Sequence, residues 1–155
     1  MDDSRLEFLT FDIWHERFGI AVADVREVVR AVSIARLPKA PRVVEGVVNV
    51  RGCIVPALDI RARFDLPPKV LEPSDHLVIA FAKRRLVAIR VDRVTDLVKL
   101  ARSDVEDLTA AVPGSNLVAG VAKLNDGLVL IHDLATFLSV SEAEALDELA
   151  EQMPL

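Results

Sequence analysis

One arginine stands where this chain could recognise a partner. Arg51-Gly52 interrupts two apolar runs, Val47–Val50 and Cys53–Leu58. Both runs are rich in β-branched residues, which favour a pleated, half-buried surface, and the glycine gives the backbone freedom for a tight reversal. The pattern predicts a β-hairpin with Arg51 near its tip. A guanidinium there presents a planar fork of hydrogen-bond donors, so Arg51 is either a solvated turn residue or a recognition point.

Residue types suited to catalysis or metal binding are few and scattered. The histidines, His15, His76 and His132, lie far apart and lack the spacing of metal ligands. Cys53 lies in an apolar run and is expected to be a small core residue. The chain contains neither a Gly-rich phosphate loop nor a Gly-x-Ser-x-Gly elbow. We therefore expect a binding module without catalysis, cofactor or metal.

Short strands dominate the predicted elements. Besides the Arg51 hairpin, two more hairpins are expected, one from His76–Ala82 and Arg85–Val91, the other from Leu117–Leu124 and Leu128–Ile131. The last has an Asp-Gly turn, a strong short-range hairpin signal. No strands alternate with long helices, so the pattern favours a β-barrel or sandwich over a doubly wound sheet.

Other segments are expected to complete the sheets and supply short helices. Further strands are predicted over Arg5–Ile13, Phe18–Val22 and Val94–Leu100. The apolar spacing in Ala23–Val29 fits one or two helical turns, and Asp59 is a suitable N-cap for a turn over Ile60–Phe64. Proline-rich residues 65–75 are interpreted as a loop that joins two halves.

A helix is predicted at the C-terminal end. Ser141 and Glu144 have the spacing of a capping box, which predicts a helix over roughly residues 142–152 with a narrow apolar stripe at Leu146 and Leu149. This helix either docks on its own core or serves an interface. A further helical turn is expected over Asp133–Leu138.

Composition limits the classes of function. The 155 residues suffice for one domain or two small packed subdomains, and the hydrophobic fraction of 52% indicates a real core. The net charge of -5 argues against nucleic acid binding, although it does not exclude local basic patches. The absence of a secretory n-region favours the cytoplasm. No apolar run approaches the roughly 20 residues that span a bilayer, so direct membrane insertion is not expected.

Several motifs together resemble the CheW family of chemotaxis coupling proteins. They are Phe18–Val22, Val25–Val29, Leu37-Pro38, Ala40-Pro41, Val44–Pro56, Leu58–Arg61, Val118–Ala122 and Leu128–Leu138. They occur in the family's order and spacing over roughly Arg5 to Leu138, and the block Val44–Arg61 is the most specific. Val50 replaces a common leucine, and His132 stands where apolar residues or asparagine often occur.

The resemblance implies a mainly β fold of two five-stranded SH3-like β-barrel subdomains packed together, with short helices and a C-terminal helix. A single CheW-like domain would span 1–155, with subdomain one over roughly 14–70 and subdomain two over 71–140 plus the N-terminal strand. The family couples cytoplasmic tips of chemoreceptors to the histidine kinase CheA, through the kinase's regulatory domain. The resemblance thus implies a cytoplasmic, non-catalytic adaptor recruited to membrane receptor arrays, where it allows self-association.

The family's partner-binding positions carry over where the chain matches them. They are Val25, Glu27, Gly46, Asn49, Val50, Arg51, Gly52 and Gly120. On physical grounds, Gly46 and Gly52 serve either backbone shape or the close approach of a partner helix. Glu27, expected on a short amphipathic turn, is a solvated carboxylate, a contact for a basic partner, or the partner of Arg51.

Other interpretations remain open from the sequence. Val25, Val28 and Val50 are either anchors for a partner helix or core residues. The same fold could serve a chemosensory-like pathway that controls pili, biofilm or second-messenger output. A small-ligand-binding barrel or hydrolase with a dispersed site is an alternative of another class, and it predicts a titratable cluster around His132 or Cys53.

Overall fold

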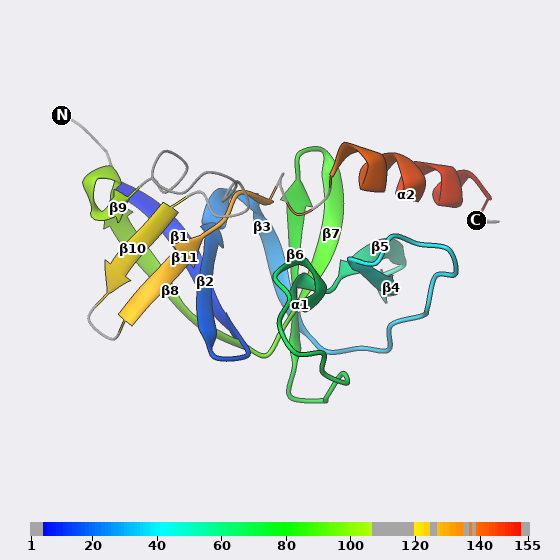
Figure 1. Cartoon of the computed structure of the whole chain (residues 1–155), viewed down its shortest axis with the longest axis horizontal. Helices are drawn as coiled ribbons and strands as arrows, with labels where there is room; N and C mark the ends of the chain where they lie inside the picture. Colours follow the sequence, from blue (N-terminus) through cyan, green and yellow to red (C-terminus); the bar gives the residue numbers. More distant parts are fainter. Residues whose placement is uncertain (1–4, 107–119, 125–126, 135–136, 138, 153–155) are drawn as a thin grey trace.

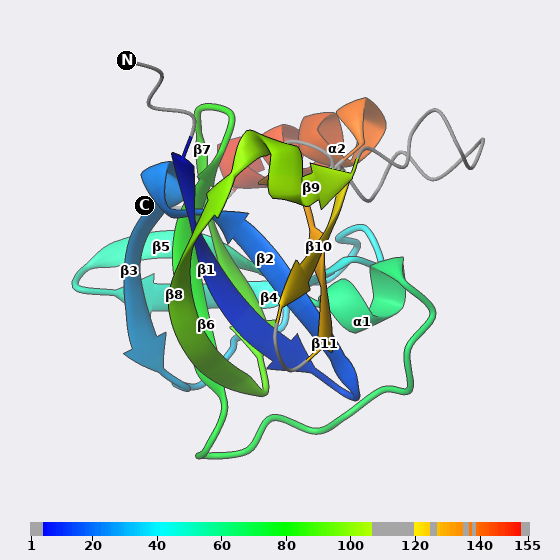
Figure 2. The ribbon, with the colours of Figure 1, turned by 90° about the vertical axis from the view of Figure 1, so that its left-hand side faces the viewer.

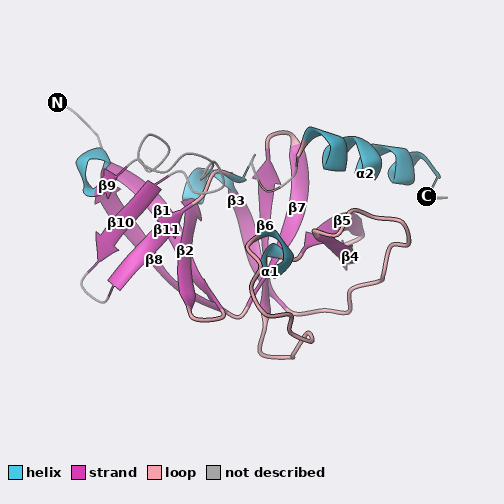
Figure 3. Ribbon diagram, in the orientation of Figure 1, coloured by secondary structure: helices cyan, strands magenta, loops and turns pink. Residues whose placement is uncertain are grey.

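The chain folds into two packed β-sheets (Figure 1, Figure 3). The computed structural model describes residues 5–106, 120–124, 127–134, 137 and 139–152. The five-stranded sheet has the order β3-β6-β7-β5-β4. Its strands are β3 (Val25–Arg30), β4 (Val44–Val50), β5 (Cys53–Leu58), β6 (His76–Ala82) and β7 (Arg85–Val91).

The second sheet has six strands among the described residues, in the order β8-β1-β2-β11-β10-β9. They are β1 (Arg5–Ile13), β2 (Glu16–Ala21), β8 (Arg93–Ala101), β9 (Val105–Glu106), β10 (Gly120–Leu124) and β11 (Gly127–Ile131). The predicted mainly β architecture of two packed subdomains is confirmed. This sheet has one strand more than expected because the short β9 pairs with β10.

The sheets divide the chain differently from the predicted boundary near residue 70. The β6–β7 hairpin joins the five-stranded sheet because β7 pairs in parallel with β5, where Ala57 lies opposite Ala88. In turn, β2 belongs to the six-stranded sheet. The loop over 65–75 therefore connects strands of one sheet. The chain passes between sheets at η1, a 3-10 turn over Val22–Asp24, and at Asp92, between β7 and β8.

The helical turns predicted over Ala23–Val29 are wrong beyond η1. From Val25 onward the backbone is the edge strand β3, antiparallel to β6. A β-bulge between Val25 and Glu27 shifts the register and interrupts strict alternation of side chains. That irregularity made apolar residues of a strand resemble the spacing of a helix.

The helix caps follow local sequence signals. The predicted turn is α1 (Ile60–Arg63), and the Asp59 carboxylate accepts a hydrogen bond from the Arg61 N–H at 3.1 Å. The C-terminal helix α2 (Val140–Gln152) begins two residues earlier than predicted. Its capping box is formed by Ser139 and Glu142: the Glu142 N–H donates to the Ser139 hydroxyl, and the Ser139 N–H donates to the Glu142 carboxylate. The turn predicted over 133–138 includes residues 135, 136 and 138, which lie outside the described residues.

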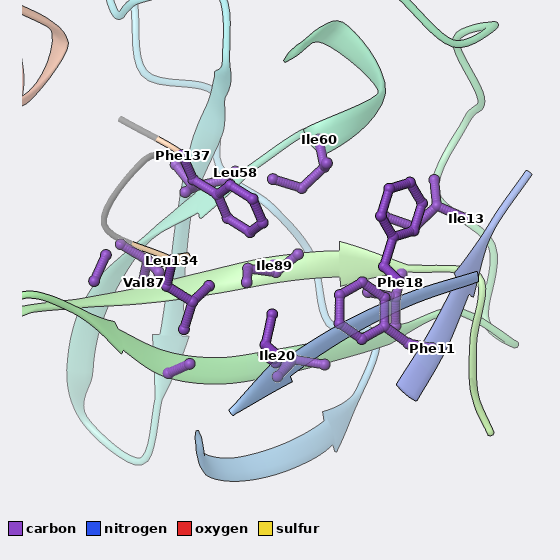
Figure 4. Close-up of a cluster of buried hydrophobic side chains, with 14 of the residues drawn as sticks. Phe11, Ile13, Phe18, Ile20, Leu58, Ile60, Val87, Ile89, Leu134 and Phe137 are labelled. Carbon is purple, nitrogen blue, oxygen red and sulfur yellow. The ribbon is translucent and has the colours of Figure 1, made fainter. Parts of the chain in front are cut away.

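The main hydrophobic core lies between the sheets (Figure 4). Phe11 and Phe18 of the six-stranded sheet stack with ring centroids 5.9 Å apart, and Ile89 on β7 belongs to the same cluster. The buried Leu146 of α2 reaches this core, so the C-terminal helix docks on its own fold. Each fully buried side chain of this kind stabilises the fold by about 1.5–3 kcal/mol. Among the described residues, no helix is long and apolar enough to cross a membrane.

Candidate functional site

The tip of the β4–β5 hairpin has a defined geometry. Arg51 and Gly52 both have positive φ, 52° and 85°, as a type I′ turn requires at its two central residues. The Asn49 side-chain oxygen accepts a hydrogen bond from the Gly52 N–H at 2.8 Å. A Cβ added at Gly52 would meet no atom within 4 Å, so this glycine is required for its backbone conformation. Together these residues fix the direction in which Arg51 leaves the turn.

An ion pair joins this tip to the opposite edge of the same sheet. A guanidinium nitrogen of Arg51 lies 3.1 Å from a carboxylate oxygen of Glu27. Glu27 is on β3, and β3 and β4 are the two edge strands of the five-stranded sheet. The pair therefore helps curl the sheet so that its edges meet, and the backbone bridge between Ala35 and Val47 adds to this closure. Of the three interpretations of Glu27 that the sequence left open, the structure shows the pairing with Arg51, and it places Glu27 on a strand.

The arginine of this ion pair is exposed to solvent, whereas the glutamate is largely buried. The Arg51 side chain is 80% exposed, while that of Glu27 is 19% exposed. An exposed pair contributes about 0–1 kcal/mol to stability. Its guanidinium donors that do not face Glu27 are left to water or a partner.

The two other glycines among the predicted positions make room for the chain itself. A Cβ on Gly46 would lie 2.2 Å from the backbone oxygen of Ala35. A Cβ on Gly120 would lie 2.6 Å from a methyl carbon of Val105. Close backbone packing accounts for both glycines, and the structure brings neither one to the Arg51 tip.

The predicted valines divide between core and surface. Val25 packs against the core between the sheets, and Val50 packs against a second core formed on the other face of the five-stranded sheet. Val28 is 38% exposed. Of the three, Val28 is the one available as a surface anchor.

The candidate catalytic residues occupy separate surroundings. Cys53 is exposed, which contradicts the predicted core position, because burial on β5 begins only at Val55. His132 is buried against aromatic rings, with centroids of Phe18 and Phe64 both 4.9 Å away. Among the described residues, no group of three potential ligands is placed to hold a metal ion.

Comparisons with known proteins identify the family of this chain. The CheW-like domain family matches residues 7–142. The chain belongs to the CheW family. It is 26% identical over 155 residues to the chemotaxis protein CheW of Treponema pallidum, covering 96% of this chain and 91% of that one. It is 27% identical over 131 residues to the chemotaxis protein CheW of Helicobacter pylori, covering 84% and 79% respectively.

A solved structure shares the fold. The scaffolding protein TtCheW from Thermoanaerobacter tengcongensis superposes with a TM-score of 0.80 at 26% identity, covering 88% of this chain and 94% of that chain. The likeness extends over both sheets and agrees with the predicted pair of SH3-like β subdomains.

The sequence analysis did not predict a set of ion pairs of two buried arginines in this CheW-family chain. One of them involves Asp92, where the chain passes from one sheet to the other. Arg61, 6% exposed, lies 2.6 Å from the Asp92 carboxylate and also donates to the Pro67 carbonyl at 2.7 Å. The backbone N–H of Trp14 donates to the same Asp92 oxygen at 2.7 Å. Burial alone would raise the pKa of Asp92, but the hydrogen bonds from Arg61 and Trp14 outweigh it and lower that pKa.

A second buried arginine extends this set. Arg90 lies 2.9 Å from the Glu45 carboxylate and donates to the Lys69 carbonyl at 2.9 Å. The Lys69 ammonium in turn lies 2.5 Å from Asp75. Burial raises the pKa of Glu45, and the Arg90 charge offsets that rise only in part. These contacts fix the 65–75 loop to the body of the fold.

Apolar side chains at two strand edges form a second candidate surface. Val28 on β3 lies opposite Val78, and Leu97 on β8 lies opposite Leu9. Val78 and Leu9 both belong to the core between the sheets, and directly opposed residues share a face. Val28 and Leu97 therefore border that core from two edge strands, 38% and 59% exposed. We call Val25, Val28 and Leu97 the apolar seam; Figure 2 shows β3 and β8 on the same side of the molecule.

Proposed function

We propose that this chain is a non-catalytic chemotaxis adaptor that couples the cytoplasmic tips of chemoreceptors to the regulatory domain of the histidine kinase CheA. The observation that carries the proposal is the exposed Arg51 side chain, oriented by Glu27 at the tip of a rigid hairpin. The names of the family members support it, because they are chemotaxis proteins and a scaffolding protein. The proposal places the protein in the cytoplasm, recruited to receptor arrays.

The hairpin tip is the surface that we assign to the kinase domain. Glu27 holds one part of the Arg51 guanidinium, and the rest of its donor fork faces outward. An oriented charge at an exposed tip contributes specificity more than stability. Asn49 and Gly52 act there as positioning residues, because they set the turn that presents Arg51.

The apolar seam is the surface that we assign to the receptor. Chemoreceptor tips in this family's systems are helical hairpins, and a helix can place an apolar face on exposed hydrophobic side chains. Val28 and Leu97 supply such side chains, and Val25 on β3 packs against the core. The two assigned surfaces use β3 from opposite faces, because Glu27 and Val28 are successive residues of one strand.

Separate surfaces permit both partners to bind at once. Each contact can be weak on its own, because assembly raises the effective concentration of the others. A receptor signal reaches the kinase only if the two sites are energetically coupled. In this account β3 is the shared element, since a shift of the strand at Val28 also moves Glu27 and with it Arg51.

The direct test is assembly of a ternary complex from purified components. The full chain is mixed with a receptor tip fragment and a CheA regulatory domain from the same organism, and complexes are resolved by analytical ultracentrifugation. We expect each binary complex and a larger complex containing all three. Failure of the chain to bind either fragment would contradict the coupling function.

A further inference from the structure

The segment that carries the apolar seam is basic within an acidic protein. Residues 26–42 contain four arginines, one lysine and a single acidic residue, whereas the whole chain has a net charge of -5. The basic residues are Arg26, Arg30, Arg36, Lys39 and Arg42, and all five are exposed. None of them forms an ion pair with another described residue.

Three acidic residues lie within or close beside this segment in the sequence: Asp24, Glu27 and Glu45. Among the described residues, none of them forms an ion pair with the basic side chains of the segment. Glu27 is engaged by Arg51, and Glu45 by Arg90. The positive charge along β3 and the residues after it is thus left to solvent or to a partner. Long exposed side chains that make no internal ion pair contribute little to folding, so the fold itself does not account for this concentration of charge.

Exposed charged and exposed apolar side chains lie together on β3. Arg26, Val28 and Arg30 are the exposed residues of β3, and the exposed Val32 follows with the same spacing. Arg30 lies opposite His76, two positions along from the Val28–Val78 pair, so Arg30 shares the face of the apolar seam. Arg26 is the unpaired residue of the bulge at the start of β3, and its side chain is exposed on the same edge strand.

This pattern specifies the chemistry of the occupant. We infer that the partner segment on the apolar seam is an acidic amphipathic helix, with apolar side chains against Val28 and Leu97 and carboxylates against Arg26 and Arg30. The inference rests on the proposed function and adds the charge of the receptor surface to it. Guanidinium groups suit carboxylates because their planar fork donates two parallel hydrogen bonds.

A protein helix fits this surface better than a polyanion. Valines stand between the arginines, and a phosphate backbone offers nothing apolar to cover them. The net charge of -5 also opposes approach of nucleic acid or an anionic bilayer as a whole. A helix with one acidic and one apolar flank matches both kinds of side chain at once.

Charge reversal at the two arginines tests the inference. The affinity of the full chain for a receptor tip fragment is measured by calorimetry at low and high salt, for the wild type and for R26E/R30E. The matched control is K83E/K123E, which changes the net charge equally at two exposed lysines outside the segment. We expect R26E/R30E to weaken binding by roughly tenfold or more at low salt, with the difference shrinking at high salt, and the control to stay within about twofold.

The outcomes of the binding experiment distinguish failure of this inference from failure of the proposed function. If the wild type binds the fragment and R26E/R30E binds it equally well, the acidic-helix inference is overturned while the coupling function stands. If the wild type does not bind the fragment, the receptor assignment and this inference fail together. In a second experiment, each glutamate of the receptor fragment is changed singly to lysine. The inference requires that at least one of these changes weakens binding to the wild type and restores binding to R26E/R30E. Binding to phosphatidylserine vesicles is measured for the same variants. If R26E/R30E loses binding to the vesicles but keeps its affinity for the receptor fragment, the acidic-helix inference is also overturned.

Discussion

Two arginine–carboxylate pairs in this molecule have the same chemistry and opposite surroundings. Arg51–Glu27 sits at a hairpin tip with the arginine 80% exposed, whereas in Arg61–Asp92 the arginine is 6% exposed. The buried pair is held by further hydrogen bonds from Trp14 and to Pro67. For the exposed pair, the described residues supply no further hydrogen bond, and the turn positions the arginine. We infer from this difference that Arg61–Asp92 maintains the arrangement of the sheets, while Arg51–Glu27 presents a charge to a partner.

Removing the half-buried Asp92 carboxylate, the counterion of the buried Arg61, should have the largest effect. Asp92→Asn keeps the shape of the side chain but leaves Arg61 with a buried charge that lacks its counterion. We expect a loss of roughly 3 kcal/mol in the free energy of unfolding, because breaking a buried pair exposes the fold to an uncompensated charge. Urea denaturation followed by circular dichroism measures it. A loss below about 1 kcal/mol would mean that Arg61–Asp92 contributes no more to the free energy of unfolding than an exposed ion pair, which would contradict the comparison.

A methyl group at Gly46, on β4 away from the tip, should cost nearly as much. In Gly46→Ala the new Cβ would overlap the backbone oxygen of Ala35, at 2.2 Å. The bridge between Ala35 and Val47 would have to shift, and we expect a destabilisation of roughly 2 kcal/mol from such overpacking. Denaturation midpoints report the change. An unaffected midpoint with lost partner binding would instead indicate that Gly46 contacts the partner.

A methyl group at the tip itself should cost less. Gly52→Ala meets no neighbouring atom, but it places an L-residue at a φ of 85°. We expect a loss of about 1 kcal/mol, and Gly52→Asn should lose less because asparagine tolerates this region. Thermal melts of both variants make the comparison. Equal losses for the two would show that backbone conformation is not what the glycine provides.

Acid should weaken the buried pair progressively. The pKa of Asp92 is lowered in the folded state, against the competing effect of burial, by the hydrogen bonds from Arg61 and Trp14. The resulting stability is therefore present above the ordinary carboxyl pKa of 3.8 and is lost as the pH falls through the lower folded value. We expect the unfolding free energy to decline over that range, and Asp92→Asn to decline less steeply. Parallel declines would assign acid sensitivity to other groups, such as Glu142, whose pKa is also lowered.

Local patterns predicted the parts of the structure that depend on neighbours in sequence. The Arg51-Gly52 turn was predictable because two β-branched runs and a glycine determine it within twelve residues. The α1 cap at Asp59 was predictable for the same reason. The C-terminal cap was misplaced because Ser139 and Ser141 are both followed three residues later by a glutamate, and only packing chooses between them.

Long-range contacts decided what the sequence left open. β3 was mistaken for helical turns because the bulge at its start can be recognised only from its pairing with β6. Cys53 was placed in the core because nothing in its run marks where the barrel ends. The partners of Arg61 and Arg90 lie 31 and 45 residues away, at Asp92 and Glu45, and no local pattern links them.

The most direct test of the account measures stability and binding on one variant. Arg51→Glu places a carboxylate beside Glu27 at an exposed tip, and Arg84→Glu is the control at an exposed arginine of the β6–β7 turn. We predict that Arg51→Glu loses less than about 1 kcal/mol of unfolding free energy while its affinity for the CheA regulatory domain falls at least roughly tenfold. A folded Arg51→Glu that binds the kinase domain as tightly as the control, or one that unfolds, would contradict the assignment of this tip to partner recognition.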